Sequence, residues 1–181
     1  AVTEVAQPET FNVVADTASP VRPEDRQALA EFQQKVAKLY RALSGSINTA
    51  NDTRTRLRAI KRALTETPTA DVKLAKTADE LEVQVNEFLR IARGDQVLAQ
   101  RNENVPASIN ERVQNIMSGE RQAIQRPTRT HMDNYTIAAE EFAGELAKLR
   151  KIVDIDLRDL EKKMEDAGAP WTPGRLPEWK E

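Results

Sequence analysis

The chain has 181 residues and a net charge of −2, with 39% apolar residues, 31% charged residues and no cysteine. Its length suits one domain, and its near-neutral charge provides no global field to attract nucleic acid or an anionic membrane. The absence of cysteine excludes disulfides, thiolate metal sites and cysteine nucleophiles. No apolar run approaches the roughly 20 residues of a spanning helix, so we expect no membrane insertion.

Residues 1–20 differ in composition from the rest of the chain. They lack a basic start followed by an apolar stretch, so we expect no signal peptide, and the start at Ala1 favours a trimmed product. Phe11, Val13 and Val14 form a short β-prone run that ends near Asp16. Because an isolated strand is unstable, two interpretations stay open: a disordered leader, or the last strand of a preceding β domain.

The first predicted helix covers about 23–66. Pro23, followed by Glu24 and Asp25, is typical of a helix start, because proline fits the first turn and acids suit the helix dipole. Apolar residues then recur every seven positions, at Leu29, Val36, Leu43, Ala50, Leu57 and Leu64. This repeat predicts one unusually long amphipathic helix.

Three further helices are predicted. One spans about 70–93, with Gly94 as its C-cap, and a loop follows it. A short helix begins after Ser108, a good N-cap, and the last helix covers about 129–166. The apolar stripe of this last helix comprises Tyr135, Ala139, Phe142, Leu146, Leu149, Val153, Leu157, Leu160 and Met164.

Long amphipathic helices cannot bury their apolar stripes alone, so they must pack on one another or on another chain. The short turn at 67–69 makes the first two helices antiparallel neighbours. Opposite charge imbalances favour placing the first and last helices side by side. The predicted fold is therefore all-α: an antiparallel up-and-down bundle of three long helices and one short helix over 21–168. An extended N-terminal segment (1–20) and an extended Pro/Trp tail (169–181) flank it.

Few residues in the sequence suggest chemistry. His131 is the only histidine, which excludes a histidine dyad, and no Glu-x-x-His pair of a di-iron bundle occurs. Glu140, Glu141 and Glu145 could serve sugar hydrolysis, but their spacing is more typical of a solvated helix face. We therefore predict no catalytic residue, no metal site and no cofactor.

A basic patch on the first helix comprises Arg54, Arg56, Arg58, Lys61 and Arg62. Nucleic-acid binding would favour stacking aromatic residues within such a patch, and none lies there. The acidic last helix is a simpler partner for these charges, so we expect no nucleic-acid binding.

The C-terminal tail contains both tryptophans of the chain. Trp171 and Trp179 lie among prolines that favour an extended backbone, including Pro173. Large aromatic side chains are costly to leave in water, so we expect the tail to anchor in a bundle groove or on a neighbouring domain. The predicted anchors are Trp171, Pro173, Leu176 and Trp179. In the alternative interpretation, the tail is a peptide-like ligand for another protein.

Three stretches of the chain resemble a known family: GDQVLAQRNENVPASINERV (94–113), YTIAAEEFAGELAKLR (135–150) and AGAPWTPGRLPEW (167–179). They resemble the C-terminal region of large bacterial proteins with a sortilin-like β-propeller, frequent in Bacteroidetes and often labelled BNR (Asp-box) repeat or glycosyl hydrolase proteins. The tail motif is the most specific of the three. In that family a fibronectin-like β domain precedes the helical region, and its last strand resembles 11–16 here.

The resemblance implies an exported protein, located outside the cell, in the periplasm or at the cell surface. Any enzymatic activity would belong to the propeller, and no Asp-box occurs here. We therefore expect a non-catalytic structural or interaction module, whose partners are the propeller and the fibronectin-like domain. The alternatives are an accessory part of a carbohydrate-active enzyme and a self-associating coiled-coil module.

Overall fold

The computed structural model describes residues 9–14, 21–101 and 103–177. The described residues are mostly helical and contain no strand, which confirms the all-α class. The elements in chain order are α1 (Pro23–Thr65), α2 (Val72–Arg93), α3 (Gln96–Gln100), α4 (Ile109–Glu120), α5 (Arg129–Lys151), the π-helical segment η1 (Ile152–Asp156) and α6 (Leu157–Asp166).

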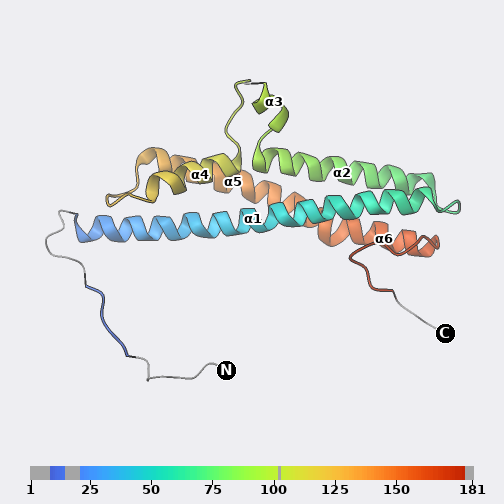
Figure 1. The fold of residues 1–181 in the computed structure, drawn as a ribbon, viewed down its shortest axis with the longest axis horizontal. Helices are drawn as coiled ribbons and strands as arrows, with labels where there is room; N and C mark the ends of the chain where they lie inside the picture. Colours follow the sequence, from blue (N-terminus) through green and yellow to red (C-terminus); the bar gives the residue numbers. More distant parts are fainter. Residues whose placement is uncertain (1–8, 15–20, 102, 178–181) are drawn as a thin grey trace.

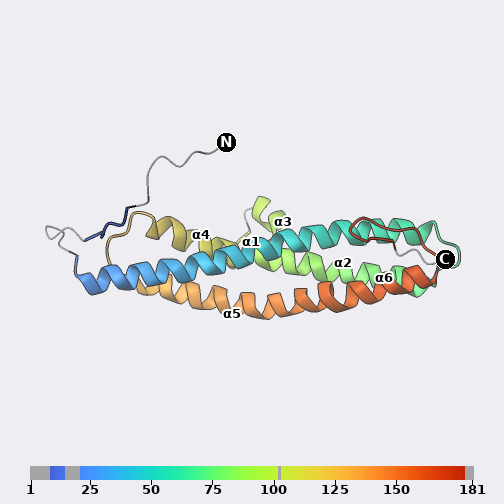
Figure 2. The same ribbon diagram turned by 90° about the horizontal axis from the view of Figure 1, so that it is seen from below.

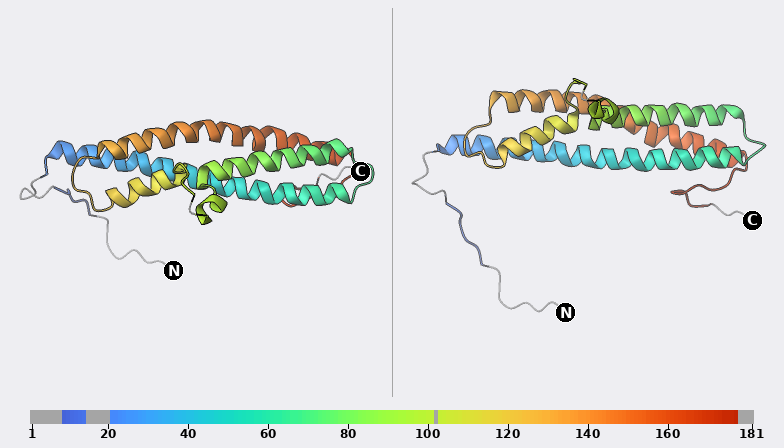
Figure 3. Two further views of the ribbon diagram at one scale, coloured as in Figure 1. Left: turned by 90° about the horizontal axis from the view of Figure 1, so that it is seen from above. Right: turned by 45° about the horizontal axis from the view of Figure 1, so that its top comes forward.

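The helices form three rods that lie side by side with their axes aligned (Figures 1 and 2). The first rod is α1 alone, whose 43 residues make it roughly 65 Å long. The second rod is α2 followed, after a loop, by α4, and both run opposite to α1. The third rod is the continuous helix α5–η1–α6, which runs in the same direction as α1 (Figure 3). Short α3 lies in the loop that projects from the middle of the second rod.

The seven-residue repeat of α1 supplies most of one wall of the core. Leu43, Ala50, Leu57 and Ile60 are fully buried, and Thr53, a polar member of the stripe, is also buried. Proline at the first helical position and two acidic residues in the first turn start the helix as predicted. The glycine at position 45 does not interrupt the helix.

Capping side chains define the starts of the later helices. Ser108 and Glu111 form a reciprocal capping box at the start of α4, and the Thr128 hydroxyl accepts a hydrogen bond from the His131 backbone. Asp95 caps α3 in the same way, accepting from the amides of Val97 and Leu98. This cap explains a helical turn that the sequence analysis placed within a loop.

The last rod contains a π-helical turn that the regular apolar stripe did not predict. The Leu157 amide donates to the Ile152 carbonyl, five residues earlier, which defines a π turn. Ile152 and Leu157 are both buried, whereas Val153 is only half-buried. Val153 therefore packs at the margin of the core stripe, and Ile152, which the predicted stripe omitted, takes the fully buried place. A spacing of five residues can keep two side chains on one helix face only if the helix widens between them.

Ion pairs between rods flank the core near the α1–α2 turn. Arg58 and Lys61 of α1 bind Glu82 of α2, and Lys61 also binds Asp79 at 2.9 Å. Arg56 binds Glu161 of α6 at 2.5 Å. The excess positive charge of α1 is thus shared between its two neighbours rather than directed to the last helix alone.

Residues 9–14 precede the rods and are in extended, exposed coil. Phe11, Val13 and Val14 are each more than 80% exposed. The predicted strand at 11–16 does not form over 11–14, and its last two residues lie outside the described residues. Its role as the edge of a β domain stays a prediction.

Candidate interaction surfaces

The C-terminal tail turns back onto the rods after α6. Gly168, with a positive φ of 73°, ends the helix, and the Ala169 amide donates to the Met164 carbonyl in a Schellman-type cap. Ala169 and Thr172 are buried against the bundle. The Thr69 hydroxyl donates to the Ala167 carbonyl and joins the α1–α2 turn to the end of α6. The first part of the tail therefore belongs to the folded body (Figure 1).

Arg175 is the side chain that holds the end of the described tail. Its guanidinium donates to Glu165 at 3.1 Å, and the Arg175 side chain is only 8% exposed. The same guanidinium lies 4.3 Å from the centre of the Trp171 ring, within the range of a cation–π interaction. Gly174, at φ 89°, lets the backbone pass close to Arg56, where a Cβ would lie 3.2 Å from the guanidinium Nε. The tail thus lies over the Arg56–Glu161 pair.

The predicted anchor residues differ in position. Trp171 covers Arg175 with one face and is 39% exposed. Pro173 is exposed and Leu176 is 89% exposed, so Leu176 does not anchor the tail on this bundle. Trp179 lies outside the described residues. A contact of these side chains with another protein stays a prediction.

The residues that attach the tail were not predicted from the sequence. Thr172 and Arg175 carry no apolar signal, and sequence reasoning favoured the tryptophans because of their area. The available signal was Gly174 directly before an arginine, since glycine permits a close backbone approach that another residue would obstruct. The acidic partner Glu165 could be identified only once the tail was known to fold back.

Most of the predicted basic patch on α1 is neutralised by other helices. Arg56, Arg58 and Lys61 each bind a carboxylate of α2 or α6, and Arg54 donates to Asn51 on its own helix. Hydrogen bonds from Lys61, and then from Arg58, hold the pKa of Glu82 below its usual value. The basic residues of this patch therefore join α1 to α2 and α6 through ion pairs.

His131 has a structural partner. Its Nδ1 lies 2.6 Å from the Glu120 carboxylate, which is buried at the end of α4. The Gln33 amide donates to the Glu120 backbone carbonyl at 3.1 Å, so α1, α4 and α5 meet at this point. Gly119 makes room for the imidazole, because a Cβ there would lie 2.6 Å from it. The histidine joins helices at the end of the rods.

The three carboxylates considered for sugar hydrolysis differ in exposure. Glu140 and Glu141 are exposed, whereas Glu145 is buried and binds Lys148, one turn along the same helix, at 2.7 Å. Over the described ranges of the chain, no three histidine, aspartate or glutamate side chains gather as metal ligands. Glu140 and Glu141 thus lie on a solvated helix face, whereas Glu145 is held at the edge of the core by a local ion pair.

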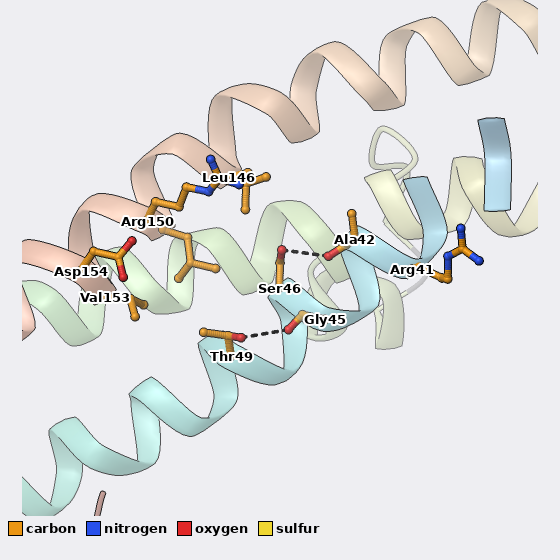
Figure 4. Close-up of a pocket in the computed structure, with 10 residues that line it drawn as sticks. Arg41, Ala42, Gly45, Ser46, Thr49, Leu146, Arg150, Val153 and Asp154 are labelled. Atoms are coloured by element: carbon orange, nitrogen blue, oxygen red, sulfur yellow. Dashed lines mark hydrogen bonds between the residues drawn. The ribbon is translucent and has the colours of Figure 1, made fainter. Parts of the chain in front are cut away.

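An open groove separates α1 from the third rod at mid-length (Figure 4). Its volume is about 380 Å³. One wall consists of Arg41, Ala42, Gly45, Ser46 and Thr49 of α1. The other consists of Leu146, Leu149, Arg150, Val153 and Asp154. We call it the α1–α5 groove.

Small side chains produce this groove. Ala42, Gly45 and Ser46 present little side-chain volume to the groove, and a Cβ added at Gly45 would meet nothing within 4 Å. The hydroxyls of Ser46 and Thr49 donate to carbonyls one turn earlier on their own helix. Among the described residues, Arg41, Arg150 and Asp154 form no ion pair or hydrogen bond through their side chains. The groove is thus open, weakly apolar and bordered by unpaired charges.

Comparison with known proteins supplies no relative. No family model, curated protein sequence or solved structure matches the chain. Within the described part of the chain, none of the helices combines the length and apolar character needed to cross a membrane. Functional inference therefore depends on the surfaces described above.

Proposed function

We propose that this chain is a non-catalytic structural and interaction module at the C-terminus of a larger exported propeller protein. In this proposal the up-and-down bundle packs on other domains of the parent protein or mediates its assembly. Its partners are the β-propeller and the fibronectin-like domain that the resemblance implies, and its location is secreted, periplasmic or at the cell surface. The resemblance of residues 167–179 to the family's tail motif supports the identity of the parent.

The observation that supports the interaction role is a set of strongly exposed apolar side chains in the two segments that flank the rods. Phe11, Val13 and Val14 before the rods, and Leu176 after them, are all more than 80% exposed. Among the described residues of the rods, Val72 alone is exposed to this degree, and most other large apolar residues there are buried or half-buried. Clustered apolar side chains in water are a frequent mark of a protein contact. The two flanking segments are therefore the surfaces that we expect a neighbouring domain to cover.

Calorimetric titration with the parent protein's propeller and fibronectin-like domain tests this role. We expect the double substitution Phe11→Ser, Val13→Ser to weaken binding at least about tenfold, because it removes apolar area from the contact. Val72→Ser is the matched control, since Val72 is 83% exposed but lies on α2. No binding, or equal loss with the control, contradicts the proposal.

A sugar assay tests the non-catalytic part of the proposal. The chain should release no reducing ends from a panel of bacterial and plant polysaccharides. Hydrolysis that survives repurification, and that the substitution Glu145→Gln abolishes, would instead indicate the accessory-enzyme alternative.

A further inference from the structure

We propose that a hollow between α1 and α4 binds a free α-amino acid with an aliphatic side chain. Glu120 holds the ammonium group of this ligand, and Arg121 holds its carboxylate. The aliphatic side chain lies against Val36, Ile116 and Met117. This inference goes beyond the proposed interaction role, because it assigns a small-molecule site, and it does not depend on the identity of the parent protein.

The hollow has the size of a small molecule. It lies where α4 packs against the first half of α1 (Figure 1). From α1 it is lined by Gln33, Val36 and Ala37. From the end of α4 it is lined by Ile116, Met117, Glu120 and Arg121. Its volume is about 230 Å³, below the roughly 300–1,000 Å³ of pockets for drug-sized ligands. We call it the α1–α4 hollow.

The lining of the α1–α4 hollow is polar at one end and apolar at the other. The Gln33 amide donates to the Glu120 backbone carbonyl at 3.1 Å, so this part of α1 meets the last turn of α4. Because the two helices run in opposite directions, Val36, one turn along α1, lies beside Ile116, one turn back on α4. Val36 and Ile116 are buried, and Met117 is half-buried. A ligand with a charged head and a short apolar body matches this division.

Glu120 carries a buried carboxylate oxygen that has no donor. Its side chain is only 6% exposed. One oxygen, Oε1, lies 2.6 Å from His131 Nδ1, whereas Oε2 has no hydrogen-bond partner among the described residues. A neutral imidazole donates one hydrogen bond and leaves the charge of the carboxylate uncompensated. A buried charge is costly unless it is both paired and hydrogen-bonded. An ammonium group supplies the opposite charge and the missing donor.

Arg121 supplies the complementary charge for the other half of the ligand head. It follows Glu120 directly and lines the same hollow. It is exposed, and within the described part of the chain its side chain forms no ion pair or hydrogen bond. A guanidinium presents a planar fork of N–H donors that matches a carboxylate. An α-amino acid carries its ammonium and carboxylate on one carbon, so both charges are matched, whereas a simple amine would leave Arg121 unmatched.

The larger α1–α5 groove lacks such a charged end. Arg41, Arg150 and Asp154 border it, but all three side chains are exposed, so water satisfies them. Desolvation of Glu120 makes the difference, because hydrogen bonds to a buried charge contribute more than those to an exposed one.

Titration of the full chain with L-leucine tests the inference, with NMR signals of the Met117 methyl group and the Arg121 amide as the readout. We expect saturable shifts of these signals, with a dissociation constant of about 1 mM or lower. L-Leucinamide lacks the carboxylate, and N-acetyl-L-leucine lacks the ammonium group. Each should therefore bind at least about tenfold more weakly than L-leucine.

Substitutions of the two charged residues separate the two head-group contacts. Arg121→Gln should weaken binding of L-leucine about tenfold or more and leave binding of L-leucinamide nearly unchanged, since that probe has no carboxylate. Glu120→Gln should weaken L-leucine by a similar factor but spare N-acetyl-L-leucine. Arg121 is exposed, so Arg121→Gln should leave thermal unfolding unchanged even if Glu120→Gln does not. Arg101→Gln, at an exposed arginine of the projecting loop, is the matched control.

Filling the apolar end provides an independent test. Ala37 is exposed at the wall of the α1–α4 hollow, so the larger side chain of Ala37→Leu can occupy the space of the ligand without disturbing the core. This variant should lose binding of L-leucine. Ala143→Leu, at an exposed alanine of α5, should bind L-leucine like the unmodified chain.

Three results would overturn the inference. The first is the absence of saturable shifts up to about 20 mM L-leucine, well above the expected dissociation constant. The second is equal binding of L-leucine, L-leucinamide and N-acetyl-L-leucine, which would mean that the charged head is not recognised. The third is unchanged binding in both Arg121→Gln and Ala37→Leu, which would place the ligand elsewhere. None of them affects the proposed contact with the propeller or the fibronectin-like domain, which the Phe11 and Val13 variants test separately.

Discussion

The two sides of α1 differ in how they meet their neighbours. Toward α2, with which α1 makes its most extensive contact, the seam is closed by leucines and isoleucines and flanked by the ion pairs of Arg58 and Lys61 with Glu82. Toward α5, small residues leave a groove of about 380 Å³ whose bordering charges are unpaired. One helix therefore contributes both a core wall and an unfilled surface, and side-chain size along its faces makes the difference.

Deleting single residues should produce the largest contrast between the two sides. Removal of Gln84 from α2 should abolish cooperative unfolding, because it rotates half of the apolar stripe by about 100° out of the core. Removal of Asp154 from η1 should preserve the fold and convert the π turn to α-helix, since it brings Ile152 and Leu157 to a four-residue spacing. Circular dichroism and urea unfolding report both outcomes. An equal loss of stability in the two deletion variants would mean that η1 does not contain an inserted residue.

Truncating a buried leucine should have the next largest effect. Leu57→Ala, at a fully buried position of α1, should lower the free energy of unfolding by about 2–5 kcal/mol through lost burial and the cavity left behind. Val83→Ala, at a position that is 67% exposed, should change it by less than about 0.5 kcal/mol. The midpoints of urea unfolding of the two variants measure this difference. A similar cost for both would contradict the placement of the core.

The tail should contribute less than the core. Arg175→Ala removes the contact with Glu165 and the stacking on Trp171, and should cost about 1–2 kcal/mol. In a chain of this size, about 1 kcal/mol lowers the unfolding midpoint by about 2–4 °C. Leu176→Ala should leave the midpoint unchanged, because this side chain is exposed. Deletion of 169–181 without any loss would show that the tail does not fold back.

Filling the groove by one methyl group should stabilise the chain slightly. Gly45→Ala should raise the free energy of unfolding by about 0.5–1 kcal/mol, because alanine favours the helix and its Cβ would meet no atom within 4 Å. Gly174→Ala is the contrasting variant, since its positive φ and the nearby Arg56 predict destabilisation. A loss of stability in Gly45→Ala would mean that the groove is closed.

The ion pairs between α1 and α2 should have the smallest effect on the free energy of unfolding, and this effect should depend on pH. The pKa of Glu82 is lowered in the folded chain, so its stabilisation is present above the unfolded glutamate pKa and is lost as pH falls through the folded value. Glu82→Gln should cost a few tenths of a kcal/mol near pH 7 and almost nothing near pH 3. Urea midpoints at the two values measure this, with Glu80→Gln, at an exposed residue, as control. If Glu82→Gln lowered the stability equally at both pH values, the effect would not come from the ion pair.

Much of the helical layout follows from residues close in sequence. The predicted helices at 23–66, 70–93 and 129–166 agree with the observed bounds within about two residues, because proline, glycine and capping side chains act locally. Helix α3 was missed because its cap, Asp95, lies within a stretch with no apolar repeat. Ile152 was omitted from the predicted core stripe because a regular spacing cannot reveal an inserted residue.

The candidate surfaces were less predictable than the helices. Sequence reasoning emphasised Trp171 and Leu176 in the tail, whereas Arg175 and Thr172 hold it, since their partners lie on other elements. The charge imbalance of α1 was recognised, but the division of its ion pairs between α2 and α6 was not. Trp179 lies outside the described residues, and its role stays a prediction.

The sequence by itself determined the all-α class, the long amphipathic first helix and the ends of the main helices, because periodicity and capping are properties of neighbouring residues. Only the tertiary structure decided which small residues face an open groove, which charges remain unpaired beside it, and where the tail comes to lie. These features depend on distances between segments far apart in the chain. Packing sets those distances, and they cannot be derived from the pattern of neighbouring residues in the sequence.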